Sequence, residues 1–352
     1  MFLAMKEIRK EKLRYGLIIG MIVLISYLIF ILTSLALGLA QQNTDAIQSW
    51  NINTVVLNKD SNVNMNQSVI TQDQLNKQKL TKQDAKVGEA MVVATSKKHA
   101  NISATYLGLD KNEFIDKNLK ITKGHNFKNN NEVVVDDKFE QSGYKLGDTF
   151  KLNDGNTAYK IAGFTHNAKI NISPVVYGNL SNWRTLKNGM PNMVASAIVS
   201  KNSKVEVQSP LKAYDKATFV NKLPGYSAQN MTFSLMIGFL MVISLIVIAI
   251  FLYILTIQKL PNYAVLRAQG VPSGVLLRST MAQSLILAIG GILIGSLLTY
   301  LTKISMPSAV PMAFDMPILS SVAFGLFITA LIGGLMPVRS LLKLDPVKVI
   351  GG

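Results

Sequence analysis

Long runs without a charged residue constrain this chain more than any other feature of its sequence. They lie at 15–44, 233–257, 279–302 and 316–338. A run of about 24 residues forms a helix of roughly 36 Å, which is enough to cross the ~30 Å hydrocarbon core of a bilayer. The sequence therefore predicts a membrane protein whose transmembrane helices lie at 15–40, 231–257, 279–302 and 316–338.

The basic residues beside these runs predict how the chain is threaded. Five Lys and Arg residues precede the first run in 1–14, three lie in 258–278, three lie in 339–352, and one lies in 303–315. Basic residues concentrate in short cytoplasmic segments. Both ends and the segment 258–278 are therefore expected inside the cell, whereas the short loop 303–315 is expected outside, together with the long segment 41–230.

The first fourteen residues combine five basic side chains with apolar ones such as Phe2, Leu3 and Ile8. This pattern predicts an amphipathic helix lying at the inner membrane surface. A secretory signal peptide is the alternative, but its apolar core usually has about 7 to 15 residues. The run at 15–44 is about twice as long, so we favour an uncleaved membrane anchor.

The segment 41–230 is polar and predicts a large α+β domain between the first and second transmembrane helices. Short β-rich runs separated by Asn, Gly, Asp and Lys predict strands at 54–57, 91–95, 102–107, 132–135, 157–164 and 195–199. Helices are expected at 74–82, 180–187 and 211–223, the last before Pro224 and Gly225.

The segment 258–278 reads QKLPNYAVLRAQGVPSGVLLR and separates two apolar runs. Pro261 suits a helix start, and Gly270 followed by Pro272 suits a helix end. We therefore expect a short, separate cytoplasmic helix between the second and third transmembrane helices. The basic residues Lys259, Arg267 and Arg278 are expected to mark its membrane face.

Several enzyme classes lack the residues that they need. The chain has no cysteine, which excludes thiol catalysis and thiolate metal sites. The histidines His99, His125 and His166 have no metal-binding spacing, and surface positions are the favoured interpretation. No GxxxxGK[ST] motif is present, so ATP would have to be bound by another subunit.

The four apolar runs also contain few polar residues that could take part in a reaction or in transport. None of them contains a charged residue, which disfavours intramembrane proteolysis and proton-coupled transport. Gln283 is the most polar residue in them and is expected to hydrogen-bond between helices. The net charge of +16 is divided between the membrane flanks and the polar domain, so nucleic acid is not an expected partner. We expect a non-catalytic protein.

Small residues recur four positions apart in the apolar runs, a spacing that lets helices approach closely. The pairs are Gly16 with Gly20, Ser34 with Gly38, and Gly291 with Gly295, and Gly333 and Gly334 lie in the last run. Packing within one chain is the favoured interpretation, and packing between copies stays open.

The run YAVLRAQG at 263–270 resembles the E-x-x-x-LRA-x-G coupling segment of the FtsX/MacB-type (type VII) ABC transporter permeases. The runs EVVVD at 132–136, KLGDT at 145–149 and YKIAGF at 159–164 are similar to successive motifs of that family's extracytoplasmic domain. The run LDPV at 344–347 resembles the family's closing signature. The order of one span, a large domain and three spans also matches.

Two departures from this family pattern stand out. Asn262 and Tyr263 occupy the region where an acid often precedes LRA, and Gln283 lies where many members have Glu. The form PNYAVLRAQG looks closer to the HrtB/DevC branch, whose better-known members export haem from Gram-positive cells with a separate ATPase subunit. The resemblance therefore implies haem export and detoxification at the cell membrane of a Gram-positive bacterium.

The resemblance also implies an assembly. A permease homodimer, surrounded by membrane lipid, would dock on two copies of an HrtA-like ABC ATPase subunit that binds the ATP, and the permease would hold no cofactor of its own. The residues that match the coupling segment, and would contact the ATPase, are Tyr263, Leu266, Arg267, Gln269 and Gly270.

Position alone suggests where haem could bind. Trp50 could stack on the macrocycle, and Tyr226 or Met231 could ligate its iron, because all three lie near the expected outer ends of the first two spans. Core packing, or a place in the interfacial aromatic belt, is the alternative for each. Two other functions stay open: export of an antimicrobial peptide or lipid, and FtsX-like signalling that controls a cell-wall hydrolase.

Overall fold

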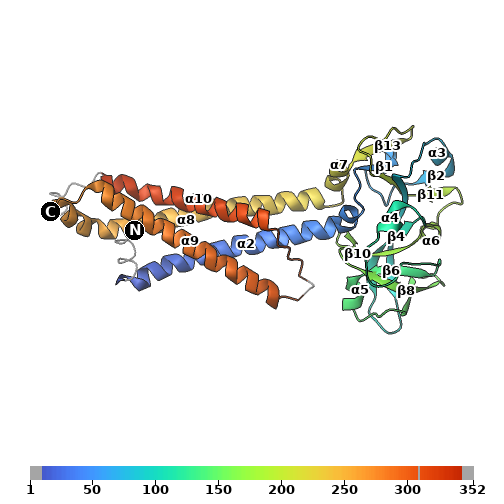
Figure 1. Ribbon diagram of the computed structural model, residues 1–352, viewed down its shortest axis with the longest axis horizontal. Coiled ribbons are helices and arrows are strands. Elements are labelled where there is room, and N and C mark those ends of the chain that lie inside the picture. The colour runs from blue at the N-terminus through green and yellow to red at the C-terminus, as the bar shows by residue number, and fades with distance from the viewer. Residues whose placement is uncertain (1–9, 308–309, 343–352) are drawn as a thin grey trace. The chain divides into compact units, whose positions relative to one another are not determined.

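The computed structural model describes residues 10–307 and 310–342, and it divides into two compact units (Figure 1). The membrane unit comprises Met1–Gly38 and Asn230–Gly352, and the globular unit comprises Leu39–Gln229. The amphipathic helix expected at 1–14 falls mostly outside the described residues, and the signature at 344–347 falls wholly outside them.

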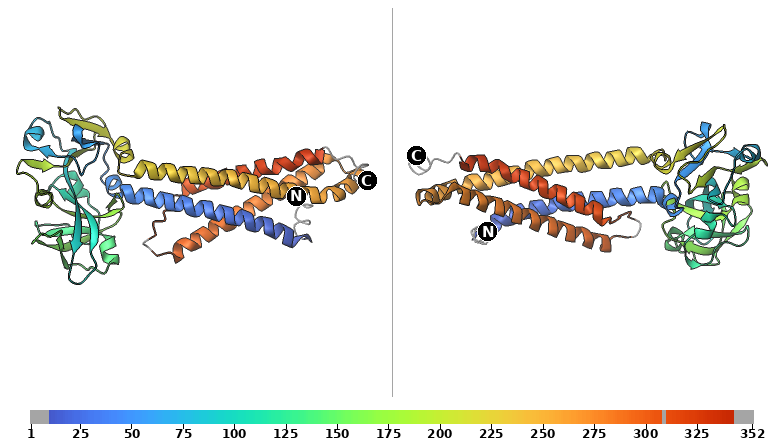
Figure 2. Two further views of the ribbon diagram at one scale, coloured as in Figure 1. Left: turned by 180° about the vertical axis from the view of Figure 1, so that it is seen from behind. Right: turned by 45° about the horizontal axis from the view of Figure 1, so that its top comes forward.

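The membrane unit is built from four long helices. These are α2 (Lys12–Ser49), α8 (Tyr226–Ala268), α9 (Ser273–Ser305) and α10 (Met316–Leu342). By length and apolar composition all four can cross a membrane, and Figure 2 shows them running alongside one another. The prediction of four transmembrane helices, with the large domain between the first and second, is confirmed.

All four helices contribute apolar side chains to one core of the membrane unit. Ile22 of α2, Leu252 of α8, Leu287 of α9 and Ala330 of α10 are all buried in it. The buried positions along α8 and α9 recur once per helical turn, singly or as adjacent pairs, as expected for a helix that buries one face.

Glycines bring α9 close to α2. A Cβ atom built on Gly291 would lie 2.4 Å from Cγ2 of Ile22, and one built on Gly295 would lie 2.1 Å from Oγ of Ser26. The Ser26 hydroxyl also donates a 3.2 Å hydrogen bond to the Gly291 carbonyl. The small-residue pair at 291 and 295 therefore serves packing within the chain, as expected.

The prediction of a separate helix at 261–270 is wrong. Helix α8 continues through Pro261 to Ala268 without a break. Pro261 lacks the amide that would bond the Ile257 carbonyl, but the buried face of α8 continues beyond it through Lys259 and Tyr263. Packing along that face keeps the chain helical at Pro261, where the proline by itself favours a helix start.

The globular unit contains one large sheet, whose strand order is β13-β1-β12-β3-β4-β10-β6-β8-β5. Strand β7 pairs with β3 and β8, β9 pairs with β10, and β2 and β11 form a separate pair. The strands are β1 (Thr54–Asn58), β2 (Ile70–Thr71), β3 (Asp84–Thr95), β4 (Ile102–Leu109), β5 (Ile121–Gly124), β6 (Glu132–Asp136), β7 (Thr149–Leu152), β8 (Ala158–Thr165), β9 (Lys169–Ile170), β10 (Ser173–Asn179), β11 (Met193–Ala195), β12 (Ala197–Ser200) and β13 (Leu211–Asp215).

Short helices cover parts of this sheet. They are the 3-10 turn η1 (Lys59–Ser61), α3 (Gln72–Asn76), α4 (Phe114–Asn118), α5 (Asp137–Gln141), α6 (Leu180–Leu186) and α7 (Lys216–Asn221). Helix α6 presses the buried Trp183 ring against Gly88, where a Cβ would lie 2.4 Å from Cγ of the indole. The indole nitrogen of Trp183 donates a 2.9 Å hydrogen bond to the Glu89 carbonyl, which fixes α6 on the sheet.

Four of the six expected strands lie within a strand, the one expected at 157–164 begins one residue before β8, and the one expected at 195–199 spans the end of β11 and most of β12. The α+β class is confirmed by these strands and the short helices among them. The helix expected at 211–223 is wrong in its first part, which is strand β13, and only α7 at 216–221 is helical. Leu211 and Ala213 pack into one core cluster, whereas Tyr214 packs against another. This alternation, together with pairing to β1, selects the strand. The helix expected at 74–82 is the shorter α3.

Candidate coupling site at the turn between α8 and α9

Helix α8 ends in a glycine-dependent hydrogen-bonding pattern. The amide of Gly270 donates to the Arg267 carbonyl at 3.0 Å, and the amide of Val271 donates to the Leu266 carbonyl at 3.0 Å. Gly270 has φ +90°, in the left-handed region that favours glycine. These features define a Schellman motif, and Pro272 then precedes the first residue of α9.

Apolar packing fixes the two helices around this turn. Tyr263, Ala264 and Leu276 are buried together, with Leu266 and Val271 packed against them. The Tyr263 and Thr280 hydroxyls lie 3.5 Å apart, at the limit of a hydrogen bond. The end of α8 and the start of α9 therefore form one compact corner.

The opposite side of this corner is exposed. Val265 and Val275 each keep 47% of their surface accessible. Gln269, Gly270 and Arg278 are exposed as well. We call Val265, Gln269, Gly270, Val275 and Arg278 the coupling face.

The residues predicted to contact an ATPase divide between the two sides. Gln269 and Gly270 belong to the coupling face, and Leu266 and Arg267 are half-buried. Tyr263 is buried in the corner, where it packs α8 on α9. The sequence interpretation missed Val265 and Val275, although both lie off the buried stripe that Tyr263 and Leu276 mark.

A buried polar cluster lies next to the corner and connects three helices. The Tyr15 hydroxyl of α2 donates a 2.7 Å hydrogen bond to Oε1 of Gln283 on α9. The ammonium group of Lys259 on α8 donates to the Tyr15 hydroxyl, and it lies 3.3 Å from Oε1 of Gln283. Its nitrogen is also 4.9 Å from the centre of the Tyr15 ring, within cation–π range.

The basic residues of 258–278 assign this segment to the cytoplasm, and that assignment does not predict that the Lys259 side chain is buried. Only 4% of Lys259 is exposed, and its side chain enters the helix bundle. The signal was available, because Lys259 continues the spacing of the buried residues Leu252 and Thr256 along α8. The expectation that Gln283 hydrogen-bonds between helices is met by its bond to Tyr15.

The three candidate haem residues have different surroundings. Trp50 is 3% exposed and belongs to a core of the globular unit, and Tyr226 is half-buried against the same core. Met231, in the membrane unit, keeps 64% of its surface exposed. The structure thus brings Trp50 and Tyr226 to one core, and it leaves the Met231 thioether accessible.

The histidines pair with acids or with the backbone. His166 lies 2.5 Å from Asp137, His99 lies 3.6 Å from Asp148, and His125 lies 2.8 Å from the Asn126 carbonyl. Within residues 10–307 and 310–342, no group of three or more histidine or acidic side chains is arranged to hold a metal ion.

A known protein family matches the C-terminal part of the chain. Residues 234–346 match the FtsX-like permease C-terminal domain. This match includes the coupling face and the whole of α9.

Two relatives match along their whole length and are described as the hemin transport system permease protein HrtB. The sequence is 25% identical over 357 residues to the Staphylococcus haemolyticus protein, covering 100% of this chain and 99% of that one. It is 28% identical over 358 residues to the Staphylococcus epidermidis protein, with the same coverage.

Two solved structures resemble part of the chain. The extracellular domain of the noncanonic ABC-type transporter YknZ from Gram-positive bacteria has 16% identity and a TM-score of 0.30, covering 45% of this chain and 83% of that one. The periplasmic region of MacB from Actinobacillus actinomycetemcomitans has 15% identity and a TM-score of 0.36, covering 48% of this chain and 92% of that one.

These matches agree with the order of the elements. Four membrane-spanning helices flank a large extracellular α+β domain between the first and the second, in a multi-pass protein of the cell membrane. The run YAVLRAQG that first indicated the family lies inside the matched region. The chain accordingly carries an FtsX-like permease C-terminal domain at 234–346, and it is similar over its full length to the permeases described as HrtB.

Proposed function

We propose that this chain is the non-catalytic permease subunit of an ABC efflux transporter, and that it expels haem with energy from a separate ATPase subunit. Full-length similarity to proteins described as hemin transport permeases supports the cargo. In the proposed assembly, two permease copies dock on two ATPase subunits, which bind the ATP.

The observation that carries the coupling part of this proposal is the exposed apolar face of a rigid corner. Val265 and Val275 lie on two helices that the Schellman motif and the buried Tyr263 hold together. A partner that moved this corner would therefore move α8 and α9 together. Arg267 and Arg278 add positive charge beside the valines, which suits an ATPase surface with acidic side chains.

The polar cluster gives a route for that movement within the membrane unit. Lys259 lies one helical turn before Tyr263 on α8, and it bonds to Tyr15 of α2. Displacement of the corner would therefore change the hydrogen bonds that join α8 to α2. In this proposal the cluster transmits force, and it performs no chemistry.

The coupling proposal is tested by placing charge on the coupling face. The double variant Val265→Asp with Val275→Asp is expected to abolish co-purification of the ATPase subunit in detergent, because two desolvated carboxylates oppose an apolar interface. The variant Val93→Asp, at another half-exposed valine in the globular unit, is the control and is expected to keep the ATPase. ATPase binding that survives the double variant would reject the coupling face.

The haem proposal needs its own measurement. Purified protein titrated with haem is expected to give a shifted Soret band, and Tyr226→Phe or Met231→Ala is expected to alter it if that side chain ligates the iron. Trp50 is buried, so Trp50→Phe is expected to leave the band unchanged unless the core rearranges. Absence of a shifted band in the unmodified protein would remove haem as the cargo bound by this chain.

A signalling role is the second candidate, because one face of strand β3 in the globular unit exposes apolar side chains. Met91 and Val93 lie two residues apart on β3, and Met91 is 73% exposed. A cell-wall hydrolase captured on such a patch would be released by Met91→Ser, whereas haem export would not change. Measuring export and hydrolase retention in the same strain separates the two functions.

A further inference from the structure

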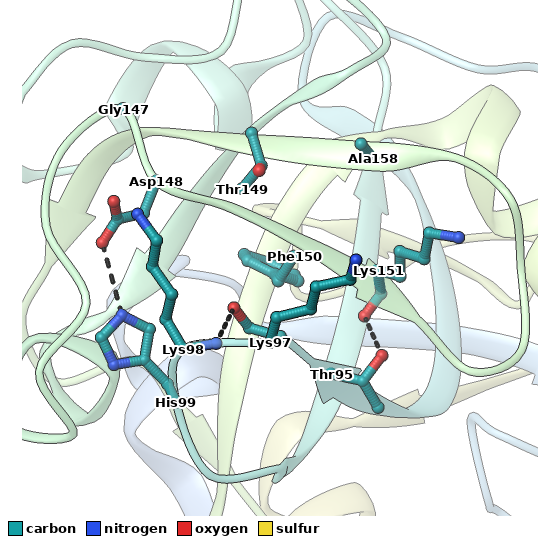
Figure 3. Close-up of a pocket in the computed structure, with 11 residues that line it drawn as sticks. Thr95, Lys97, Lys98, His99, Gly147, Asp148, Thr149, Phe150, Lys151 and Ala158 are labelled. Carbon is teal, nitrogen blue, oxygen red and sulfur yellow. Dashed lines mark hydrogen bonds and ion pairs between the residues drawn. The ribbon is translucent and has the colours of Figure 1, made fainter.

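A pocket in the globular unit contains none of the residues to which the proposed function assigns a role (Figure 3). Its volume is about 660 Å³, and its walls are the end of β3, the loop that follows it, and strand β7 with the turn before it. The lining residues are 95–99, 147–151 and Ala158. Pockets of roughly 300 to 1,000 Å³ are typical of small-ligand sites.

The lining of this pocket is strongly basic. Lys97, Lys98 and Lys151 line it and are exposed, and none of them forms an ion pair with another described residue. Its carboxylate, Asp148, is already engaged: its Oδ2 accepts a 2.8 Å hydrogen bond from the Lys145 amide and lies 3.6 Å from Nε2 of His99. The pocket therefore holds uncompensated positive charge.

The framework under these lysines is fixed by strand pairing. Thr95 and Lys151 are directly opposed in the β3–β7 ladder, so the start of the Lys97 loop is held beside Lys151. Phe150 is buried below, in edge-on contact with Tyr144 at 6.0 Å between ring centres. Figure 3 shows the Lys97 and Lys98 side chains extending from one loop in different directions, Lys98 toward Asp148 and Lys97 toward Lys151.

Hydroxyl groups complete the donor set. Thr95, Ser96 and Thr149 line the same walls as the lysines. The Thr95 hydroxyl donates to the Lys151 carbonyl at 3.5 Å and the Ser96 hydroxyl accepts from the Lys98 amide at 3.4 Å, so a ligand would compete with these contacts, whereas the Thr149 hydroxyl has no hydrogen-bond partner among the described residues. Lysine ammonium groups act as point charges for phosphate oxygens, and neighbouring hydroxyl groups can donate to the remaining ones. The volume exceeds what one phosphate needs, which favours a ligand with more than one anionic group.

We propose that the pocket of Lys97, Lys98 and Lys151 binds a phosphate-bearing anion on the extracellular side. The inference does not depend on the cargo or on the ATPase, because it uses only residues of the globular unit. The anion could be a soluble phosphate ester or a phosphodiester polymer, since both present the same oxygens to the lysines.

The test is isothermal titration calorimetry of the full chain in detergent, with inorganic pyrophosphate in one arm and a synthetic glycerol phosphate oligomer in the other. Binding in at least one arm is expected, and the arm that binds more tightly identifies the source. The variant K97Q/K98Q/K151Q is expected to weaken that binding by at least about tenfold, because charge-assisted hydrogen bonds are lost. The variant K97R/K98R/K151R is expected to retain it.

The matched control removes the same charge elsewhere. Lys117, Lys120 and Lys222 are exposed on the globular unit and do not line the pocket, so K117Q/K120Q/K222Q is expected to bind like the unmodified chain. Equal weakening by both glutamine variants would mean a diffuse electrostatic effect and would overturn the site. Failure of the unmodified chain to bind in both arms would overturn it as well.

Discussion

The phenol of Tyr15 donates a 2.7 Å hydrogen bond to Oε1 of Gln283, and this contact joins the first transmembrane helix to the third. Lys259 donates to the same phenol, so the second transmembrane helix meets the other two at one point. The three residues are separated widely in the sequence and converge only in the folded bundle. They connect the α8–α9 corner to α2.

The energy of the Tyr15–Gln283 contact can be measured with a double-mutant cycle. Tyr15→Phe and Gln283→Leu are each expected to lower stability, and the pair is expected to show a coupling energy of about 1 kcal/mol, as for interhelical hydrogen bonds in membranes. Unfolding in detergent is followed by far-ultraviolet circular dichroism. The control pairs Tyr15→Phe with Thr33→Val, because Thr33 bonds to the Ile29 carbonyl of its own helix. That cycle is expected to be additive.

Two adjacent glycines of α9 give a matched test of close helix packing. Gly291→Ala is expected to destabilise the bundle by about 1–3 kcal/mol, because the new Cβ would lie 2.4 Å from Cγ2 of Ile22. Gly290→Ala meets no atom within 4 Å and gains helix propensity, so it is expected to be neutral or stabilising. Similar melting temperatures for the two variants would contradict the α2–α9 contact.

The end of α8 offers a second glycine comparison. Gly270→Ala is expected to cost about 1 kcal/mol or more, because alanine is strained at φ +90°. Gly274, in the first turn of α9, has open space around its Cα, and Gly274→Ala is expected to cost nothing. If Gly270→Ala weakens ATPase association and Gly274→Ala does not, the result supports a role of the turn geometry in coupling. Equal free energies of unfolding for the two variants would contradict the Schellman motif at the end of α8.

Stability of the globular unit is expected to depend on a buried carboxyl group. Burial raises the pKa of Glu89 from its usual 4.5 to about 7, and the positive charge of Lys187 opposes that rise only in part. Between pH 4.5 and 7 the folded chain therefore holds a proton that the unfolded chain has lost. The free energy of unfolding is expected to fall as pH rises through this window.

Glu89→Gln is expected to make this fall smaller. It is not expected to remove it, because burial also raises the pKa of Glu113 and of Asp136 to about 7. Tryptophan fluorescence is a suitable probe, because Trp50 and Trp183, the 2 tryptophans of the chain, both lie in the globular unit. Glu206→Gln, at an exposed position, is expected to leave the pH dependence unchanged. An unaltered slope for Glu89→Gln would contradict the assignment.

The transmembrane helices and about half of the strands were predictable because their signals are local. An apolar run of spanning length has few alternatives, and β-rich runs such as 132–135 carry their pattern in neighbouring residues. Strand β13 was not predictable in this way. Its five residues are compatible with a helix by local preference. Pairing with β1, more than 150 positions earlier, makes them a strand.

The candidate site shows the same division. The resemblance of YAVLRAQG is the basis for proposing a coupling role for this segment, and Gly270 correctly marked the end of its helix. Pro261 misled, because tertiary packing kept α8 helical through it. The burial of Lys259 was missed because the sequence interpretation used its charge and not its position among the buried residues of α8. Its contact with Tyr15 could not be predicted locally, because it forms only when α2 and α8 pack together.

The position of β1 in the sheet has a consequence for biosynthesis. The first strand of the globular unit lies between β12 and β13, the last strands to be made. Its backbone hydrogen bonds with β12 can form only after residue 200 has been translocated, and those with β13 only after residue 215, so the sheet closes late and through contacts distant in sequence. If only part of the domain were exported, the edges of β1 would stay unpaired and open to aggregation. The second transmembrane helix follows β13 in the chain, so both partner strands of β1 are translocated before that helix enters the membrane.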